Sequence, residues 1–121
     1  MSHTEVFDRA VYDRLVAELG VDDAAEALNV FLADTAGKLA RLSADGLDRM
    51  AARRAAHSIK SSSATFGFLE LSRLAREVEQ GAERMSPEHL RASVHELHSA
   101  FLLISRPAGV LLPVDAREFS R

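Results

Sequence analysis

The fold is decided by residues 47–81, which read LDRMAARRAAHSIKSSSATFGFLELSRLAREVEQG. Apolar and small side chains recur in this stretch every three or four residues, the spacing that places them on one face of an α-helix. The first set comprises Leu47, Met50, Ala51, Ala55, Ile59, Ser62 and Phe66. The second set comprises Leu71, Leu74, Ala75 and Val78, and it ends near Gly81. We therefore predict two consecutive amphipathic helices that are separated at Gly67.

Upstream of this stretch, about residues 6–19 form a short amphipathic segment. Val11, Leu15 and Leu19 are four residues apart, so they share one helical face. Gly20 follows, and it can adopt the left-handed conformation that ends many helices. We therefore predict a short first helix that stops at Gly20.

A longer helix is predicted between this segment and residue 43. Asp23 and Glu26 have the spacing of a capping box, with Asp23 in the cap. The apolar face behind them comprises Ala24, Ala27, Leu28, Phe31, Leu32, Thr35, Leu39 and Leu42. Gly37 inside this helix costs about 1 kcal/mol relative to Ala. We therefore expect close packing against a neighbouring helix at Gly37.

The last predicted helix begins with Ser86 as its N-cap and Pro87 in its first turn. Its narrow apolar face comprises Leu90, Val94, Leu97, Phe101 and Ile104. Beyond it, residues 106–121 contain Pro107, Gly109 and Pro113 and lose the helical spacing, so we predict an extended tail.

Four substantial helices with short connections favour an all-α fold. The expected architecture is an antiparallel up-and-down four-helix bundle, with the short N-terminal helix as an additional element. We assign residues 1–105 to this bundle domain and residues 106–121 to the tail, and we expect a monomer.

Composition excludes several classes of function. The chain has 121 residues and a formal net charge of −3, enough for one domain and too little for two independent cores. It contains no Cys, which excludes disulfides and thiolate chemistry and favours the cytoplasm. No apolar stretch approaches the roughly 18 residues that cross a bilayer. Mild acidity argues against nucleic acid as a partner. We expect a cytoplasmic protein that binds neither membranes nor nucleic acid.

His57 is the candidate functional residue. At about 100° per residue, its side chain points about 160° away from the middle of the apolar face, so we expect it in solvent. The same strip of the helix carries Arg53, Lys60, Ser61 and Ala64.

An exposed neutral imidazole is a competent nucleophile near pH 7. A phosphoryl group on His57 would bring roughly 1.5 to 2 negative charges, which Lys60 and Arg53 could partly offset. The small side chains of Ser61 and Ala64 leave room for a partner protein to approach the ring. From these residues alone, two interpretations of His57 stay open: an ordinary surface histidine with charged neighbours, which is the more common case, and a phosphate carrier.

The string from Ala56 to Glu79, AHSIKSSSATFGFLELSRLAREVE, carries a family resemblance. It resembles the signature of histidine-containing phosphotransfer (Hpt) domains, in which Ala-His-x-x-Lys-Gly-Ser precedes a Gly, two Leu and a Leu-Glu pair. About eight positions agree in register, and the resemblance covers about residues 5–105. It implies an exposed phosphorylatable His on a four-helix bundle that carries phosphate within a two-component phosphorelay.

The resemblance also implies roles for individual residues. His57 matches the phosphorylated His, and Lys60 matches the Lys that steadies the phosphoryl group. Glu79 falls where some members hydrogen-bond the inner ring nitrogen and so orient the imidazole. Ser61 replaces the usual Gly at a position kept small for docking, a departure that bears on partner fit. Gly67 matches the Gly that ends the helix, while the core positions of the family fall on Leu71 and Leu74.

Partners follow from the same resemblance. We expect receiver domains of response regulators, together with a hybrid or sensor histidine kinase, to dock on a surface that includes Arg53, Ser61 and Ala64. The chain needs no cofactor of its own, because the receiver supplies the acidic pocket and its Mg²⁺. The sequence has no Gly-rich phosphate loop, so we expect no kinase activity.

Two rival functions remain open. A histidine-kinase dimerisation bundle also exposes a phosphorylatable His, but there an acidic residue and soon a Pro usually follow, whereas Ser58 follows His57 and the next Pro is Pro87. A helical adaptor could bind receivers without phosphotransfer, although His57 with Lys60 weighs against it.

Other residues suggest weaker alternatives. His95 and His98 are three apart and lack the four-residue spacing of the zincin motif, so we interpret them, with His89, as surface histidines and predict no metal site. The serines at 61–63 lack the surroundings of a nucleophile, and we interpret them as helix-interior residues facing small gaps.

Overall fold

The computed structural model describes residues 6–44 and 47–105. Within these ranges the chain forms helices and no strands, which confirms the predicted all-helical class. The five helices are α1 (Arg9–Leu19), α2 (Val21–Ala44), α3 (Arg49–Phe66), α4 (Leu69–Gly81) and α5 (Pro87–Ser105). The tail predicted for residues 106–121 lies outside the described residues.

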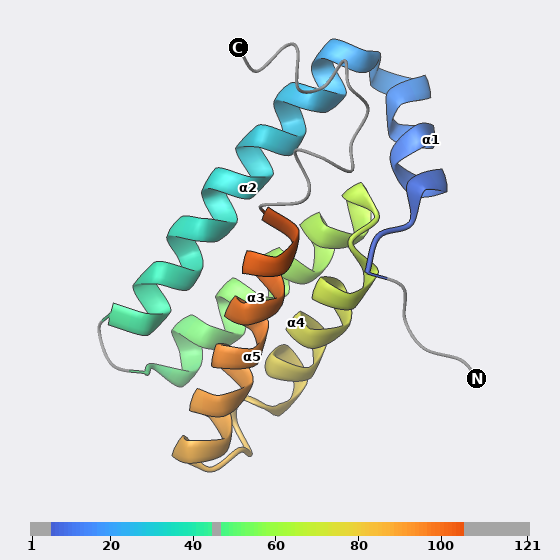
Figure 1. Ribbon diagram of the computed structural model, residues 1–121. Helices are drawn as coiled ribbons and strands as arrows, with labels where there is room; N and C mark the ends of the chain where they lie inside the picture. Colours follow the sequence, from blue (N-terminus) through green and yellow to red (C-terminus); the bar gives the residue numbers. More distant parts are fainter. Residues whose placement is uncertain (1–5, 45–46, 106–121) are drawn as a thin grey trace, which may run out of the picture.

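Helices α2 to α5 form a ring around one core. Each packs against two others, because α2 contacts α3, α3 contacts α4, α4 contacts α5, and α5 contacts α2. Consecutive helices run alongside one another in opposite directions, and α1 lies beside the start of α2 (Figure 1). Helix α1 also contacts α3, so it covers one end of the ring.

The last two helices agree with the sequence prediction. Their predicted apolar faces are buried along the whole of α4 and α5. Ser86 caps α5, since its Oγ accepts a hydrogen bond of 3.1 Å from His89 N, and Pro87 is the first helical residue. No helix within the described ranges combines the length and the apolarity that spanning a bilayer requires.

The junction of α1 and α2 differs from the prediction. Gly20 has φ 92° and ψ 160°, which is not the left-handed helical conformation expected there. Because Gly20 alone joins the two helices, α2 begins at Val21, and Asp23 lies in its first turn instead of capping it. The Gly20 carbonyl accepts the first helical hydrogen bond, at 3.0 Å from Ala24 N.

Two packing expectations in this half are wrong. Leu19 is 45% exposed although it shares a face with the buried Tyr12, because it is the last residue of α1. Gly37 has no neighbouring helix against it, since a methyl group at that position would meet only Arg41 Nη1, at 3.5 Å.

The buried face of α3 is rotated relative to the prediction. The predicted face was centred on Ala55, whereas the buried residues are Ala52, Ala56, Ile59, Ser63 and Phe66. Met50 is 49% exposed. A serine can occupy the buried face because Ser63 Oγ donates a hydrogen bond of 2.5 Å to the carbonyl of Ile59.

Aromatic rings fill the core where α3 meets α4. Phe31 of α2 lies 5.1 Å from Phe66 and 5.9 Å from Phe68, measured between ring centroids. Phe7 lies 5.2 Å from Phe68, which joins the segment before α1 to the same cluster. These contacts hold α3 in one orientation, and that orientation decides which side chains of α3 face outward.

Candidate functional site

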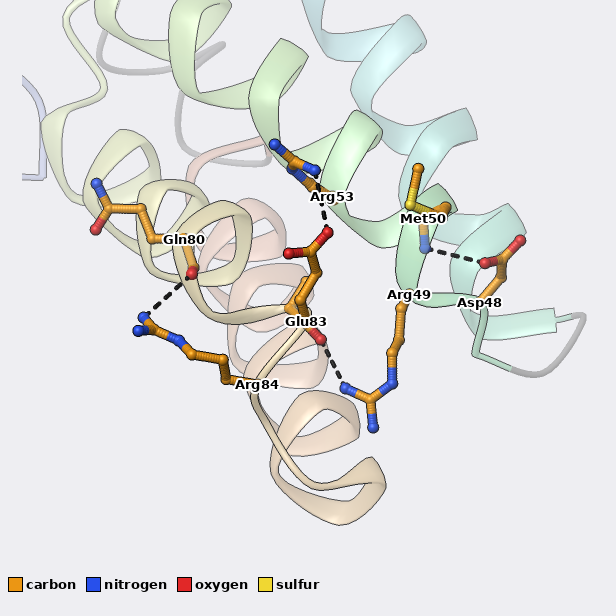
Figure 2. Close-up of polar contacts among 8 residues, drawn as sticks. Asp48, Arg49, Met50, Arg53, Gln80, Glu83 and Arg84 are labelled. Atoms are coloured by element: carbon orange, nitrogen blue, oxygen red, sulfur yellow. Dashed lines mark hydrogen bonds and ion pairs between the residues drawn. The ribbon is translucent and has the colours of Figure 1, made fainter.

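The N-terminal end of helix α3 is hydrogen-bonded to the connection between α4 and α5. Arg49 Nη1 donates hydrogen bonds to the carbonyls of Ala82 and Met85, each at 2.6 Å. Figure 2 shows this guanidinium reaching across from the start of α3. The link sets the register of α3 against α4, and two turns further along α3 the side chain of His57 is 66% exposed.

The imidazole of His57 contacts a carboxylate of α4. Its Nδ1 lies 2.6 Å from Glu79 Oε2. The other carboxylate oxygen, Oε1, lies 2.7 Å from Lys60 Nζ. The side chain of Glu79 is 18% exposed, far less than that of His57. The structure therefore brings His57, Lys60 and Glu79 together, with the carboxylate bridging an imidazole and an ammonium group.

This arrangement selects the proton position on the ring. The ion pair with Lys60, and then the hydrogen bond from His57, holds the pKa of Glu79 below its usual value, so the carboxyl is ionised at neutral pH. An ionised carboxylate can only accept hydrogen bonds. Neutral His57 must therefore carry its proton on Nδ1 to make the contact, which leaves the lone pair on Nε2.

A carboxylate of the connection after α4 pairs with Arg53. Glu83 Oε2 lies 3.3 Å from Arg53 Nη1, and Figure 2 shows the two side chains reaching toward each other between α3 and α4. Arg53 also lines a hollow of about 490 Å³ that includes His57, Glu79 and Arg54. Two cations of α3 lie on the α4 side of His57. Arg53 is paired with Glu83, and Lys60 is paired with Glu79.

The remaining predicted docking positions lie open on α3. Ser61 and Ala64 are exposed. The Ser61 carbonyl accepts a hydrogen bond of 3.1 Å from Thr65 Oγ1, while the Ser61 side chain makes none within the described residues. A partner that approaches the imidazole along this strip meets only a hydroxymethyl and a methyl group.

Comparison with known protein families identifies the family of this chain. A family model described as Hpt domain matches residues 26–104. The chain belongs to the Hpt domain family. Comparison with curated proteins and with solved structures gave no match.

Membership carries the coarse function. Hpt domains are phosphocarrier modules of two-component signalling that transfer phosphoryl groups through a histidine and are not kinases; they interact with response regulators and kinases. The match begins inside α2, so α1 of this Hpt domain lies outside it.

Two charged residues that lie beside the candidate site, Glu83 and Arg54, were not indicated by the sequence. Glu83 lies in the connection after α4, beyond the last helical residue Gly81, so no helical spacing places it beside Arg53. Arg54 lies three positions before His57, and Arg53 lies four positions before it, so helical spacing alone does not distinguish the two arginines. In the described residues, no three or more His, Cys, Asp or Glu side chains group to hold a metal ion.

The lowered pKa of Glu79 predicts a pH dependence of stability. The unfolded carboxyl titrates near its usual value of 4.5, and the folded carboxyl titrates below it. Ionised Glu79 therefore stabilises the fold above that pH, and the contribution is lost as the pH falls through the folded value. We expect wild type to unfold at higher denaturant concentration than Glu79→Gln at pH 7, and the difference to vanish once the pH has fallen below the pKa of folded Glu79. Urea titrations across this range test it; a difference independent of pH would contradict the ionic origin.

Proposed function

We propose that His57 accepts a phosphoryl group on Nε2 and exchanges it with the aspartate of receiver domains in a multistep phosphorelay. The observation that carries this proposal is the exposed imidazole whose Nδ1 is engaged by a carboxylate with a lowered pKa. The carboxylate thereby orients the ring with Nε2 toward an incoming protein. Lys60, which contacts the same carboxylate, is within reach of a phosphoryl group on Nε2.

Phosphoryl transfer to His57 forms one bond to phosphorus and breaks another. The Nε2 lone pair attacks phosphorus of an aspartyl phosphate, an Nε2–P bond forms, and the P–O bond to the aspartate breaks as the carboxylate departs. The imidazole keeps its Nδ1 proton and becomes an imidazolium, whose charge Glu79 offsets. Onward transfer to a second receiver reverses these bond changes. The acidic pocket and Mg²⁺ are assigned to the receiver, and this chain supplies the nucleophile, the charge of Lys60 and a docking surface.

Receiver profiling tests the proposal directly. The protein is incubated with each receiver domain of its source organism, prephosphorylated with radiolabelled phosphate, and label on this chain is followed over time. We expect rapid label transfer from a small subset of receivers. Transfer from none of them, while binding to a receiver persists, would favour the adaptor function.

Lys60→Ala tests the role of the ammonium group. The substitution removes the partner of Glu79 Oε1 and the positive charge one turn from His57. We expect the phosphohistidine half-life to shorten by about three- to tenfold, because a partly exposed ion pair contributes up to about 1 kcal/mol. Loss of label from purified phosphoprotein measures it. Lys60→Arg, which keeps the charge, should retain most of the lifetime; equal loss in both variants would remove the charge from the explanation.

Ser61→Leu tests the docking strip. A bulky side chain beside His57 should obstruct a receiver and leave a small donor unaffected. With phosphoramidate, Nε2 attacks phosphorus and ammonia leaves, and we expect this rate to change less than twofold. Transfer from the best receiver should fall by about tenfold or more. Ser61→Gly should transfer at least as well as wild type. Equal loss with both donors would contradict a docking role.

We further propose that residues 1–105 form one antiparallel up-and-down four-helix domain that works as a monomer in the cytoplasm. The closed ring of helices within a single chain supports this assignment, since no second chain is needed to cover the core. A gel-filtration mass of one chain is expected, whereas an obligate dimer would favour the kinase dimerisation alternative.

A further inference from the structure

A separate hollow lies on the α2 side of α3. It has a volume of about 480 Å³ and lies between the two helices. Its apolar lining comprises Leu42, Ala51 and Ala55. Its charged lining comprises Lys38, Arg41, Asp48 and Arg54. The hollow therefore combines an apolar wall with three cationic side chains.

Two of these charges already have partners. Lys38 Nζ forms an ion pair with Asp34, one turn earlier on α2. Asp48 caps α3, because its Oδ1 accepts a hydrogen bond of 3.0 Å from Met50 N. Neither group is fully available to a ligand.

Arg41 and Arg54 are different. Both side chains are exposed, and neither makes a hydrogen bond or an ion pair within the part of the chain that the structure describes. A guanidinium presents a planar fork of donors that suits a carboxylate. Among the described residues, the hollow thus offers two guanidinium groups without an ion-pair partner beside apolar surface.

The two sides of His57 consequently differ in charge. On the α4 side, Glu79 and Glu83 neutralise Lys60 and Arg53. On the α2 side, Arg54 has no carboxylate partner among the described residues. It lines both this hollow and the one that contains His57. Two further hollows on the α4 side include Lys60. One has Leu69 as its single apolar lining residue, beside Arg73 and Arg76, and the other has no apolar lining residue. An acidic surface with an apolar protrusion is therefore better matched to the α2 side.

We infer that the hollow between α2 and α3 anchors the receiver domain, by accepting a partner carboxylate on Arg41 and Arg54 and an adjacent apolar side chain against Leu42, Ala51 and Ala55. The inference rests on the proposed phosphotransfer function and adds the site that recognises the partner. It extends the docking surface sideways from the strip of Ser61 and Ala64. Charges at the edge of an interface act mainly on encounter and dissociation, and therefore on the receiver concentration needed.

The test is single-turnover transfer from phosphorylated protein to the receiver that exchanges fastest in the panel, at varied receiver concentration. The variants are Arg41→Gln, Arg54→Gln and the two combined. The matched control combines Arg14→Gln on α1 with Arg91→Gln on α5, which changes the net charge equally on helices that do not line the hollow. Circular dichroism verifies that each variant is folded.

We expect the double variant to raise the half-saturating receiver concentration by about tenfold, with the maximal rate changed less than twofold. Each single variant should lie in between, and the control should match wild type. The effect should also shrink as ionic strength rises, because the attraction is electrostatic.

Three results would overturn the inference. An unchanged half-saturating concentration in the double variant would assign the hollow to some other ligand. An equal rise in the control would mean that net charge alone matters. A fall in maximal rate without a change in half-saturation would place the arginines in the chemical step. Failure of the proposed function looks different, because wild type itself would then exchange phosphate with no receiver.

Discussion

His57→Gln abolishes phosphate incorporation, from phosphorylated receivers and from phosphoramidate alike, if the imidazole is the acceptor. The amide of glutamine has no nucleophilic lone pair on nitrogen, so no Nε2–P bond can form. The side chain at this position is 66% exposed, so its removal leaves no cavity. We therefore expect the free energy of unfolding to change by less than about 1 kcal/mol, as for other exposed substitutions.

Radiolabel incorporation and thermal unfolding followed by circular dichroism measure the two halves of this expectation. His95→Gln is the matched control, because it removes another exposed imidazole from a helix, α5, without touching the site. Label retained by His57→Gln would identify a different acceptor. A large loss of stability would show that the ring supports the core.

Gly67→Ala should have the largest effect on stability. Gly67 ends α3 in the left-handed conformation, with φ 91° and ψ 11°, which costs an alanine roughly 1–2 kcal/mol. A methyl group there would also lie 2.6 Å from the carbonyl oxygen of Asp8 and 3.3 Å from Val11 Cβ. That oxygen belongs to backbone at the start of α1, which Asp8 N ties to the Gly67 carbonyl at 2.8 Å. We therefore expect a total loss of about 2–4 kcal/mol.

Gly37→Ala is the control for this prediction. Gly37 lies inside α2, where the added methyl meets only Arg41 Nη1 at 3.5 Å. Alanine is the better helix former, so we expect stability to rise by up to about 1 kcal/mol. Denaturant unfolding of both variants decides the matter. A similar loss of stability in both would mean that the contact of Gly67 with the start of α1 contributes little.

The parts of the fold that the sequence predicted well are those governed by local spacing. The apolar faces of α4 and α5 follow the intervals of three and four residues, and Ser86 with Pro87 marks the start of α5. The errors fall where a neighbouring element changes the outcome. Asp23 is displaced from the cap because Gly20 alone links two helices.

The candidate site divides in the same way. The outward direction of His57 follows from its position relative to Ile59 on one helix. The family resemblance suggests the approach of Glu79, whereas the pairing of Arg53 on α3 with Glu83 in the connection after α4 has no resemblance to indicate it. The roles of His57, Lys60 and Glu79 in transfer remain predictions that the proposed variants test.

By itself the sequence determined the all-helical class, the helical faces near the C-terminus, and the presence of a histidine on a polar strip with a lysine one turn away. These are local properties, because a helix places residues three and four apart on one face whatever surrounds it. Only the tertiary structure decided that one carboxylate of α4 joins His57 to Lys60, that Arg53 is neutralised while Arg54 is not, and that a hollow opens toward α2. Such contacts depend on the rotation and register of packed helices, which the whole core sets jointly.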